Sequence, residues 1–188
     1  MLKKMRGFTL IELLIVVAII GILAALLIPN ALAAIQKAKQ KTAMKEIMTM
    51  STGAMDYITD HGDWTNVTQN GAITQGTGVS VAIAPFYIKA CPINDPWNTA
   101  YQCGVGDATN INSYLTGTAA TDVGNDDFLF ASYGRNGEVG SLTYDPQNPE
   151  NSRYNVGGMS DFDNDLVAWS GNWVIGPATA LVQNASGS

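Results

Sequence analysis

A single carboxylate lies inside the longest apolar run of the chain. Residues 8–28 carry one charged side chain, Glu12, and are otherwise uncharged. A carboxylate near the start of a membrane span costs roughly 3 kcal/mol or more unless a partner neutralises it, so such a residue indicates a function. Glu12 is therefore the first candidate functional residue.

The residues just before Glu12 indicate where a partner can come from. If the chain is cleaved after Gly7 on the cytoplasmic side, the new amino group belongs to Phe8, four residues before Glu12. Between staggered helices of neighbouring subunits, the amine of one subunit can meet the carboxylate of the next. This pairing favours one axial register in lipid, where unpaired charges are costly.

Two other interpretations of this N-terminus compete. One is a secretory signal peptide with Ala31-Leu32-Ala33 as its cleavage site, and the other is a plain signal anchor. A signal peptide gains nothing from Glu12, so the carboxylate argues for the processing site.

The apolar run has the dimensions of a membrane span. As a helix, residues 8–28 rise about 30 Å, the thickness of the hydrocarbon core of a bilayer. Lys3, Lys4 and Arg6 precede it, which predicts a cytoplasmic N-terminus and an exported remainder.

Residues 7–25 closely resemble the class III signal of type IV pilins and of the pseudopilins of type II secretion. The matching sequence is Gly-Phe-Thr-Leu-Ile-Glu-Leu-Leu-Ile-Val-Val-Ala-Ile-Ile-Gly-Ile-Leu-Ala-Ala. The resemblance implies cleavage after Gly7 by a membrane prepilin peptidase, usually with N-methylation of Phe8.

A helical period continues beyond the span. Residues expected on its apolar face are Ile35, Ala38, Met44, Ile47, Met48, Ser51, Met55 and Ile58. Gly62 after His61 is the expected stop. A helix over residues 8–60 would reach about 80 Å, and its first half has no partner within its own domain. Other copies of the chain, or lipid, must cover that half, which predicts polymerisation.

Two features of this stem have further interpretations. Pro29 removes an amide donor and is expected to kink or locally melt the helix. The family shares a proline here, which favours a hinge for filament packing over a tolerated kink. Lys37, Lys39 and Lys41 are expected to be solvated at the level of the lipid headgroups.

The rest of the chain predicts a small β-rich head. Residues 79–83, 128–133 and 166–169 are expected strands, and residues 66–78 and 104–127 are expected loops. The predicted fold is α+β, type IV pilin-like, with a long N-terminal helix and a small antiparallel sheet. The predicted organisation is a cleaved leader (1–7), a transmembrane assembly helix (8–29), an amphipathic half-stem (30–61) and a head (62–188).

Two cysteines, Cys91 and Cys103, lie twelve positions apart in the predicted head. Their spacing is not that of a zinc site, and the chain has one histidine. In an exported domain the expected arrangement is one disulfide, worth roughly 3 kcal/mol. Two reduced, buried thiols are the alternative.

Alternating carboxylates suggest a cation site. Asp161, Asp163 and Asp165 are spaced as hard oxygen ligands are in calcium loops, although no complete EF-hand is present. The major pseudopilins have a similar layout, and the resemblance implies a structural Ca²⁺ with Asn136 at a position where they have Asp. The alternative is a solvated acidic turn.

A second head segment also resembles the major pseudopilins. Asp95-Pro96-Trp97-Asn98-Thr99-Ala100-Tyr101 is similar to their Asp-Pro-Trp-Gly-x-Pro-Tyr, with Asn98 in place of Gly and Ala100 in place of Pro. Trp97 and Tyr101 are expected to be core aromatics.

Charge and composition exclude several functions. The chain has net charge −6, and seven of its ten basic residues lie in the first 45 positions. The acidic remainder argues against a nucleic-acid partner. One histidine and exposed-looking carboxylates give no arrangement for catalysis, so no enzyme is expected.

The predicted function is therefore that of a structural subunit that polymerises into a helical filament, as the resemblance to a type II secretion major pseudopilin implies. The alternative is a type IV pilus pilin for adhesion, motility or DNA uptake, and a monomeric signal-anchored binding protein is a third possibility. Implied partners are copies of the chain, the prepilin peptidase, the inner-membrane assembly platform, minor pilins or pseudopilins, and the lipid bilayer before assembly. The implied location is the inner membrane with the head in the periplasm, and a filament in the periplasm or at the cell surface.

Overall fold

The computed structural model describes residues 8–106, 123–145 and 147–178. The predicted leader, residues 1–7 with Gly7 at its end, lies outside the described residues. The chain divides into two compact units, residues 1–36 and 37–188. Helix α1 (Leu10–His61) contributes to both units.

Helix α1 confirms the predicted stem and its end. It continues as an α-helix through Pro29, so the turn around this proline is not melted. It ends where Gly62, at φ 90°, donates its N–H to the Ile58 carbonyl at 2.7 Å. A glycine in the left-handed conformation is the common way to end a helix.

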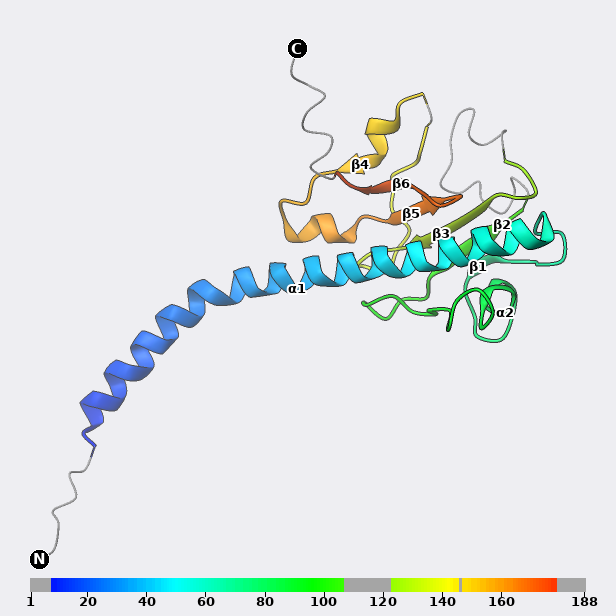
Figure 1. Cartoon of the computed structure of the whole chain (residues 1–188). Coiled ribbons are helices and arrows are strands. Elements are labelled where there is room, and N and C mark those ends of the chain that lie inside the picture. The colour runs from blue at the N-terminus through cyan, green and yellow to red at the C-terminus, as the bar shows by residue number, and fades with distance from the viewer. Residues whose placement is uncertain (1–7, 107–122, 146, 179–188) are drawn as a thin grey trace, which may run out of the picture. The chain divides into compact units, whose positions relative to one another are not determined.

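The second unit contains one six-stranded sheet with the order β1-β2-β3-β5-β6-β4 (Figure 1). The strands are β1 (Asn70–Ala72), β2 (Gln102–Val105), β3 (Phe128–Ser132), β4 (Arg153–Tyr154), β5 (Leu166–Trp169) and β6 (Asn172–Pro177). All neighbours are antiparallel except β4, which runs parallel to β6. The sheet is thus mixed, whereas a purely antiparallel sheet was predicted. The exception is the two-residue edge strand β4, which follows the 3-10 helix η2 (Pro149–Ser152) and runs in the same direction as β6.

Of the three predicted strands, two are confirmed and one is wrong. Strands β3 and β5 match residues 128–133 and 166–169 closely. Residues 79–83 form a short helix, α2 (Val79–Ile83), because the two large residues that are fully buried, Val79 and Ile83, are one helical turn apart. A short apolar run cannot by itself be told from a buried helical turn.

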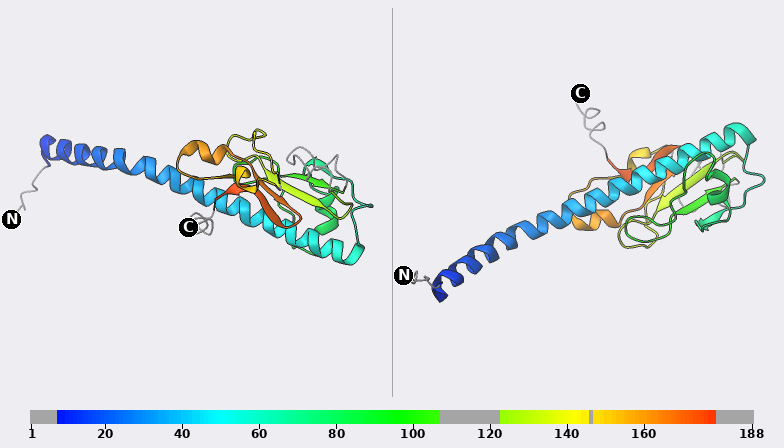
Figure 2. Two further views of the ribbon diagram at one scale, coloured as in Figure 1. Left: turned by 90° about the horizontal axis from the view of Figure 1, so that it is seen from above. Right: turned by 60° about the horizontal axis from the view of Figure 1, so that its bottom comes forward.

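The core of the second unit lies between α1 and one face of the sheet. Figure 2 shows the sheet beside the C-terminal part of α1. Phe128 and Phe130 of β3 belong to this core, whereas Leu129 and Ala131 point to the opposite face and form a second cluster with β5 and β6. Strand β3 is buried on both faces and is the centre of the head.

The buried face of α1 is rotated from the one predicted. Ile47 and Ser51 are buried as expected, but Met55 is exposed, and the helix instead buries Gln40, Ala43, Met50, Gly53, Ala54 and Tyr57. Small residues allow the close approach: a Cβ on Gly53 would lie 2.7 Å from Cγ2 of Ile88. The predicted face included Ala38, which is exposed, and missed the buried Ala43 and Gly53, because periodicity does not show which small residues face a closely packed partner.

Candidate functional site

Glu12 is held by the residue that caps α1. Its Oε2 accepts hydrogen bonds from the backbone N–H of Thr9 at 2.9 Å and from the Thr9 hydroxyl at 2.7 Å. In return, Thr9 Oγ1 accepts the N–H of Glu12 at 3.3 Å. This is a capping box, in which the cap residue and the third helical residue satisfy each other's free backbone donors.

The capping box does not test the role predicted for Glu12, and its pairing with the Phe8 amine of a neighbouring subunit stays a prediction. The carboxylate has local partners within one subunit, and its second oxygen, Oε1, makes no hydrogen bond among the described residues. Phe8, whose amine is predicted to pair with Glu12 of a neighbouring subunit, is 78% exposed. Thr9 was missed as a functional residue, although the spacing Thr-x-x-Glu is a sequence signal for this cap.

The helix that follows Glu12 presents its apolar side chains to its surroundings. Apart from the half-buried Ala24, residues 8–35 are exposed. Within the described part of the chain, α1 is the one helix long and apolar enough to cross a membrane. An uncovered apolar helix of this length requires lipid or other proteins around it. Pro29 lies in this exposed stretch, and its predicted hinge role stays a prediction.

In the head, the Asp95-Pro96-Trp97 segment is a structural turn. Buried Asp95 accepts the N–H groups of Trp97 and Thr99 at 3.0 and 2.9 Å and the Ser132 hydroxyl at 2.7 Å. Asn98 has φ 72°, a left-handed conformation that Gly adopts freely and Asn tolerates. This explains why Asn can stand where the resembling sequences have Gly.

Tyr101, at the end of that turn, connects the head to helix α1 through a hydrogen bond. Its ring is fully buried, and its hydroxyl donates to Oε2 of Glu46 on α1 at 2.5 Å. Burial, together with this bond, raises the pKa of Tyr101 well above its usual range. The prediction that Tyr101 is a core aromatic is thus confirmed, whereas Trp97 is only half-buried and packs against the same core.

Gly134 lets the chain just before Asn136 lie against the segment that carries Asp163. It has φ 69°, and a Cβ there would lie 2.7 Å from the carbonyl oxygens of Phe162 and Asn164. The next residue, Arg135, donates its N–H to the Phe162 carbonyl at 2.8 Å. Only glycine fits between these backbones.

Three of the four predicted calcium ligands have other partners. Asp163 forms a bidentate ion pair with Arg135, in which Nε donates to Oδ1 at 2.7 Å and Nη2 donates to Oδ2 at 2.9 Å. These bonds lower the pKa of the Asp163 carboxyl. Asp161 accepts the N–H groups of Gly158 and Gly157, which lowers its pKa. Asn136 Oδ1 accepts the N–H of Glu138.

Asp165 is the predicted ligand that fits a cation. It is 1% exposed, its Oδ2 accepts the Gly140 N–H at 2.9 Å, and its Oδ1 is buried without a hydrogen-bond partner. Burial raises the pKa of this carboxyl to about 6. No group of three or more His, Cys, Asp or Glu side chains is arranged to hold a metal in the ranges that the structure describes. Of the four predicted ligands, Asp165 is therefore the one with a buried side-chain oxygen that has no hydrogen-bond partner, and calcium binding stays a prediction.

Both cysteines are free thiols in the structure, so the predicted disulfide is not formed in it. Cys103 is buried in the main core, and Cys91 packs against the same cluster. Burial raises the pKa of both thiols, that of Cys91 to about 11.

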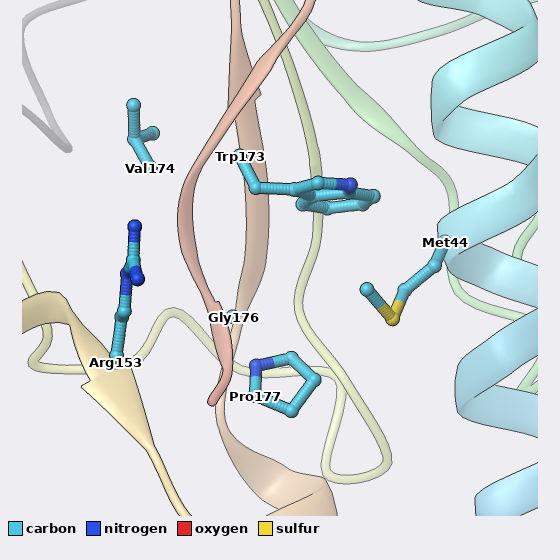
Figure 3. A pocket seen from close by; sticks show the side chains of 6 residues that line it. All are labelled: Met44, Arg153, Trp173, Val174, Gly176 and Pro177. Carbon is cyan, nitrogen blue, oxygen red and sulfur yellow. The ribbon is translucent and has the colours of Figure 1, made fainter. Parts of the chain in front are cut away.

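A cavity of about 110 Å³ lies between α1, β4 and β6. Its lining is Met44, Arg153, Trp173, Val174, Gly176 and Pro177. In Figure 3 the Trp173 ring points toward Met44, while Arg153 and Val174 lie on the other side of the strand. Among the described residues, this lining includes no carboxylate, His, Cys or hydroxyl side chain.

Comparison with known proteins agrees with this picture of an assembly helix and a structural head. The family model described as "Prokaryotic N-terminal methylation motif" matches residues 2–28. The chain is similar to "Type II secretion system core protein G" of Vibrio cholerae, with 33% identity over 65% of this chain and 89% of that protein. The protein of the same name from Dickeya chrysanthemi is 26% identical over 93% of this chain and 90% of its own length.

A "Fimbrial protein" of Neisseria meningitidis is 32% identical over 60% of this chain and 61% of its own length. No solved structure matches the chain. Since the relative from Vibrio cholerae exceeds 30% identity over most of its length, the chain belongs to the family of type II secretion system core protein G, the type IV pilin-like major pseudopilins.

Proposed function

We propose that this chain polymerises into a helical filament that drives protein export, as the major subunit of a type II secretion pseudopilus. The observation that carries the proposal is the exposed apolar segment of residues 8–35 with Glu12 near its start. Its side chains are covered by lipid before assembly and by neighbouring copies afterwards.

Assembly would use the chemistry of the N-terminus. Cleavage after Gly7 by a prepilin peptidase frees the Phe8 amine, which is then N-methylated. The Thr9 bonds hold Oε2 of Glu12 and leave Oε1 for the amine of a neighbouring subunit. In lipid this pairing selects one axial stagger, because every other register leaves both charges unpaired.

The proposed surroundings follow from the same segment. The N-terminus lies on the cytoplasmic side of the inner membrane and the head in the periplasm. The inner-membrane assembly platform extracts the subunit, and minor pseudopilins complete the filament. In this oxidising compartment Cys91 and Cys103 would form a disulfide.

Replacing the carboxylate tests the proposal. Glu12→Ala should leave processing and membrane insertion intact and abolish filaments and secretion, whereas Glu150→Ala, which removes an exposed carboxylate of the head, should change neither. Filaments are measured by shearing and electron microscopy, and secretion by exoprotein activity in the medium. Normal filaments with Glu12→Ala would refute the proposed role.

The second candidate is a type IV pilus pilin, which the similarity to a fimbrial protein favours. Deleting the chain separates the two functions. Loss of secretion with intact surface pili supports the pseudopilus, and loss of pili with intact secretion supports the pilin.

We also propose that the head binds a structural Ca²⁺. Asp165 is the ligand with an available oxygen, and Asp163 would exchange Arg135 for the ion. A bound cation would neutralise the buried carboxylate and tie the 136–140 turn to β5. Chelation should then lower the melting temperature of the full chain in detergent, and added Ca²⁺ should restore it. A melting curve unchanged by excess chelator would contradict calcium binding.

A further inference from the structure

The uncovered face of α1 in the second unit carries two separate rows of charge. Lys37, Lys41 and Lys45 follow one another at four-residue spacing, and Asp56 and Asp60 repeat that spacing further along. All five side chains are exposed. Residues four apart lie on one helix face, so each row forms a stripe.

Among the described residues, the lysine row has no acidic partner within its own subunit. Arg135–Asp163 is the one ion pair among the described residues. Lysines spaced four apart repel one another and destabilise a helix, so three of them in a row need a compensating role. Glu46, the nearest carboxylate along the helix, is engaged by Tyr101.

The acidic row has the complementary character. Asp60 is exposed and accepts the Tyr87 hydroxyl at 2.9 Å through Oδ2. No lysine or arginine of the described residues pairs with Asp56 or Asp60. Between the rows, Thr49 and Thr52 donate their hydroxyls to carbonyls of their own helix. The middle of the face is therefore neutral and its two ends have opposite charge.

We propose that the lysine row of one subunit docks on the acidic row of a second copy of this chain in the filament. All copies cross the membrane in the same direction, so their stems are parallel. Parallel helices with opposite charge at their two ends attract when one is displaced along the other. Because both rows have four-residue spacing, displacement by 15 residues pairs Lys41 with Asp56 and Lys45 with Asp60. Displacement by 19 residues pairs Lys37 with Asp56 and Lys41 with Asp60.

These two displacements correspond to about 22 and 28 Å along the helix axis. A head-to-tail contact of this kind does not close on itself and so repeats indefinitely, as a filament requires. Anionic lipid headgroups would account for the lysine row alone and give the acidic row no role. This inference rests on the proposed filament function and adds a second contact outside the membrane. It joins a different pair of neighbouring stems from the pair that Glu12 and the Phe8 amine place in register.

Charge exchange in the full chain, expressed with its secretion machinery, tests the pairing. Lys41→Glu should reduce sheared filaments at least ~10-fold, because it places like charges at the contact. The matched control Lys89→Glu makes the same change on an exposed lysine outside α1 and should stay within about twofold of the unmodified chain. Adding Asp56→Lys or Asp60→Lys to Lys41→Glu should restore filaments, and the variant that restores them identifies the displacement.

The outcomes separate this inference from the proposed function. Rescue by either aspartate exchange supports the pairing. Failure of both exchanges, or normal filaments with Lys41→Glu, overturns it while Glu12-dependent filaments still support the proposed function. Lys41→Glu can also weaken binding of the chain to vesicles that contain anionic lipid. If it does, and neither aspartate exchange restores filaments, the pairing is overturned and the lysine row is assigned to lipid. Absence of filaments from the unmodified chain would refute the proposed function itself.

Discussion

Removing one hydroxyl from the head should measurably loosen it from the stem. In Tyr101→Phe the fully buried ring stays, and only its 2.5 Å hydrogen bond to the Glu46 carboxylate is lost. A hydrogen bond to a charged group contributes about 1.5–3 kcal/mol. Glu46 is half-buried, so water can replace the lost donor in part, and we expect a loss of about 2 kcal/mol.

The assay is equilibrium unfolding of the full chain in detergent micelles, followed by near-UV circular dichroism of the head. For a protein of this size, 2 kcal/mol corresponds to a fall in melting temperature of about 4–8 °C. Tyr133→Phe is the matched control, since the Tyr133 hydroxyl makes no hydrogen bond with the described residues. If Tyr101→Phe unfolds within about 0.5 kcal/mol of the unmodified chain while the control behaves as expected, the bond does not hold head to stem.

Three further predictions concern the same head. Gly134→Ala should destabilise it by about 2–4 kcal/mol in chemical unfolding, because of the positive φ and the 2.7 Å approach to two carbonyls; an unchanged midpoint would contradict this. Burial raises the pKa of Asp165 to about 6 in the folded state. In chelator, stability should therefore fall by up to about 3 kcal/mol from pH 4 to pH 7, since the folded chain holds a proton that the unfolded chain has lost, and Asp165→Asn should flatten this dependence. Mass spectrometry of exported chain without reductant should show Cys91 joined to Cys103; full alkylation of both thiols would exclude the disulfide.

The assembly segment could be predicted almost entirely from sequence. The length of the apolar run, the carboxylate within it and the glycine after His61 are local features, and they correctly predicted α1 and its end. Strands β3 and β5 were also found, because each is a continuous apolar run that is buried on both faces. The family followed from the same N-terminal residues.

Strands β1, β2, β4 and β6 were not predicted. The first three are two to four residues long and carry little apolar pattern, whereas β6 contains the apolar run Trp173–Ile175 and was missed. The partners of charged groups also escaped prediction. Asp163 was expected to bind a metal and pairs with Arg135, which lies 28 residues earlier in the chain. Asp95, identified in the sequence only as part of a segment that resembles the major pseudopilins, accepts a hydrogen bond from the Ser132 hydroxyl.

The sequence by itself determined the membrane-sized helix, the charge at its start and the family, because these depend on residues close together along the chain. Only the tertiary structure decided which side of the stem is buried, that Tyr101 fastens the head to Glu46, and that Asp165 alone of the predicted ligands has a buried oxygen without a partner. The physical reason is that the burial and pairing of a side chain depend on segments brought close by folding, such as Gly134 against residues 162–164.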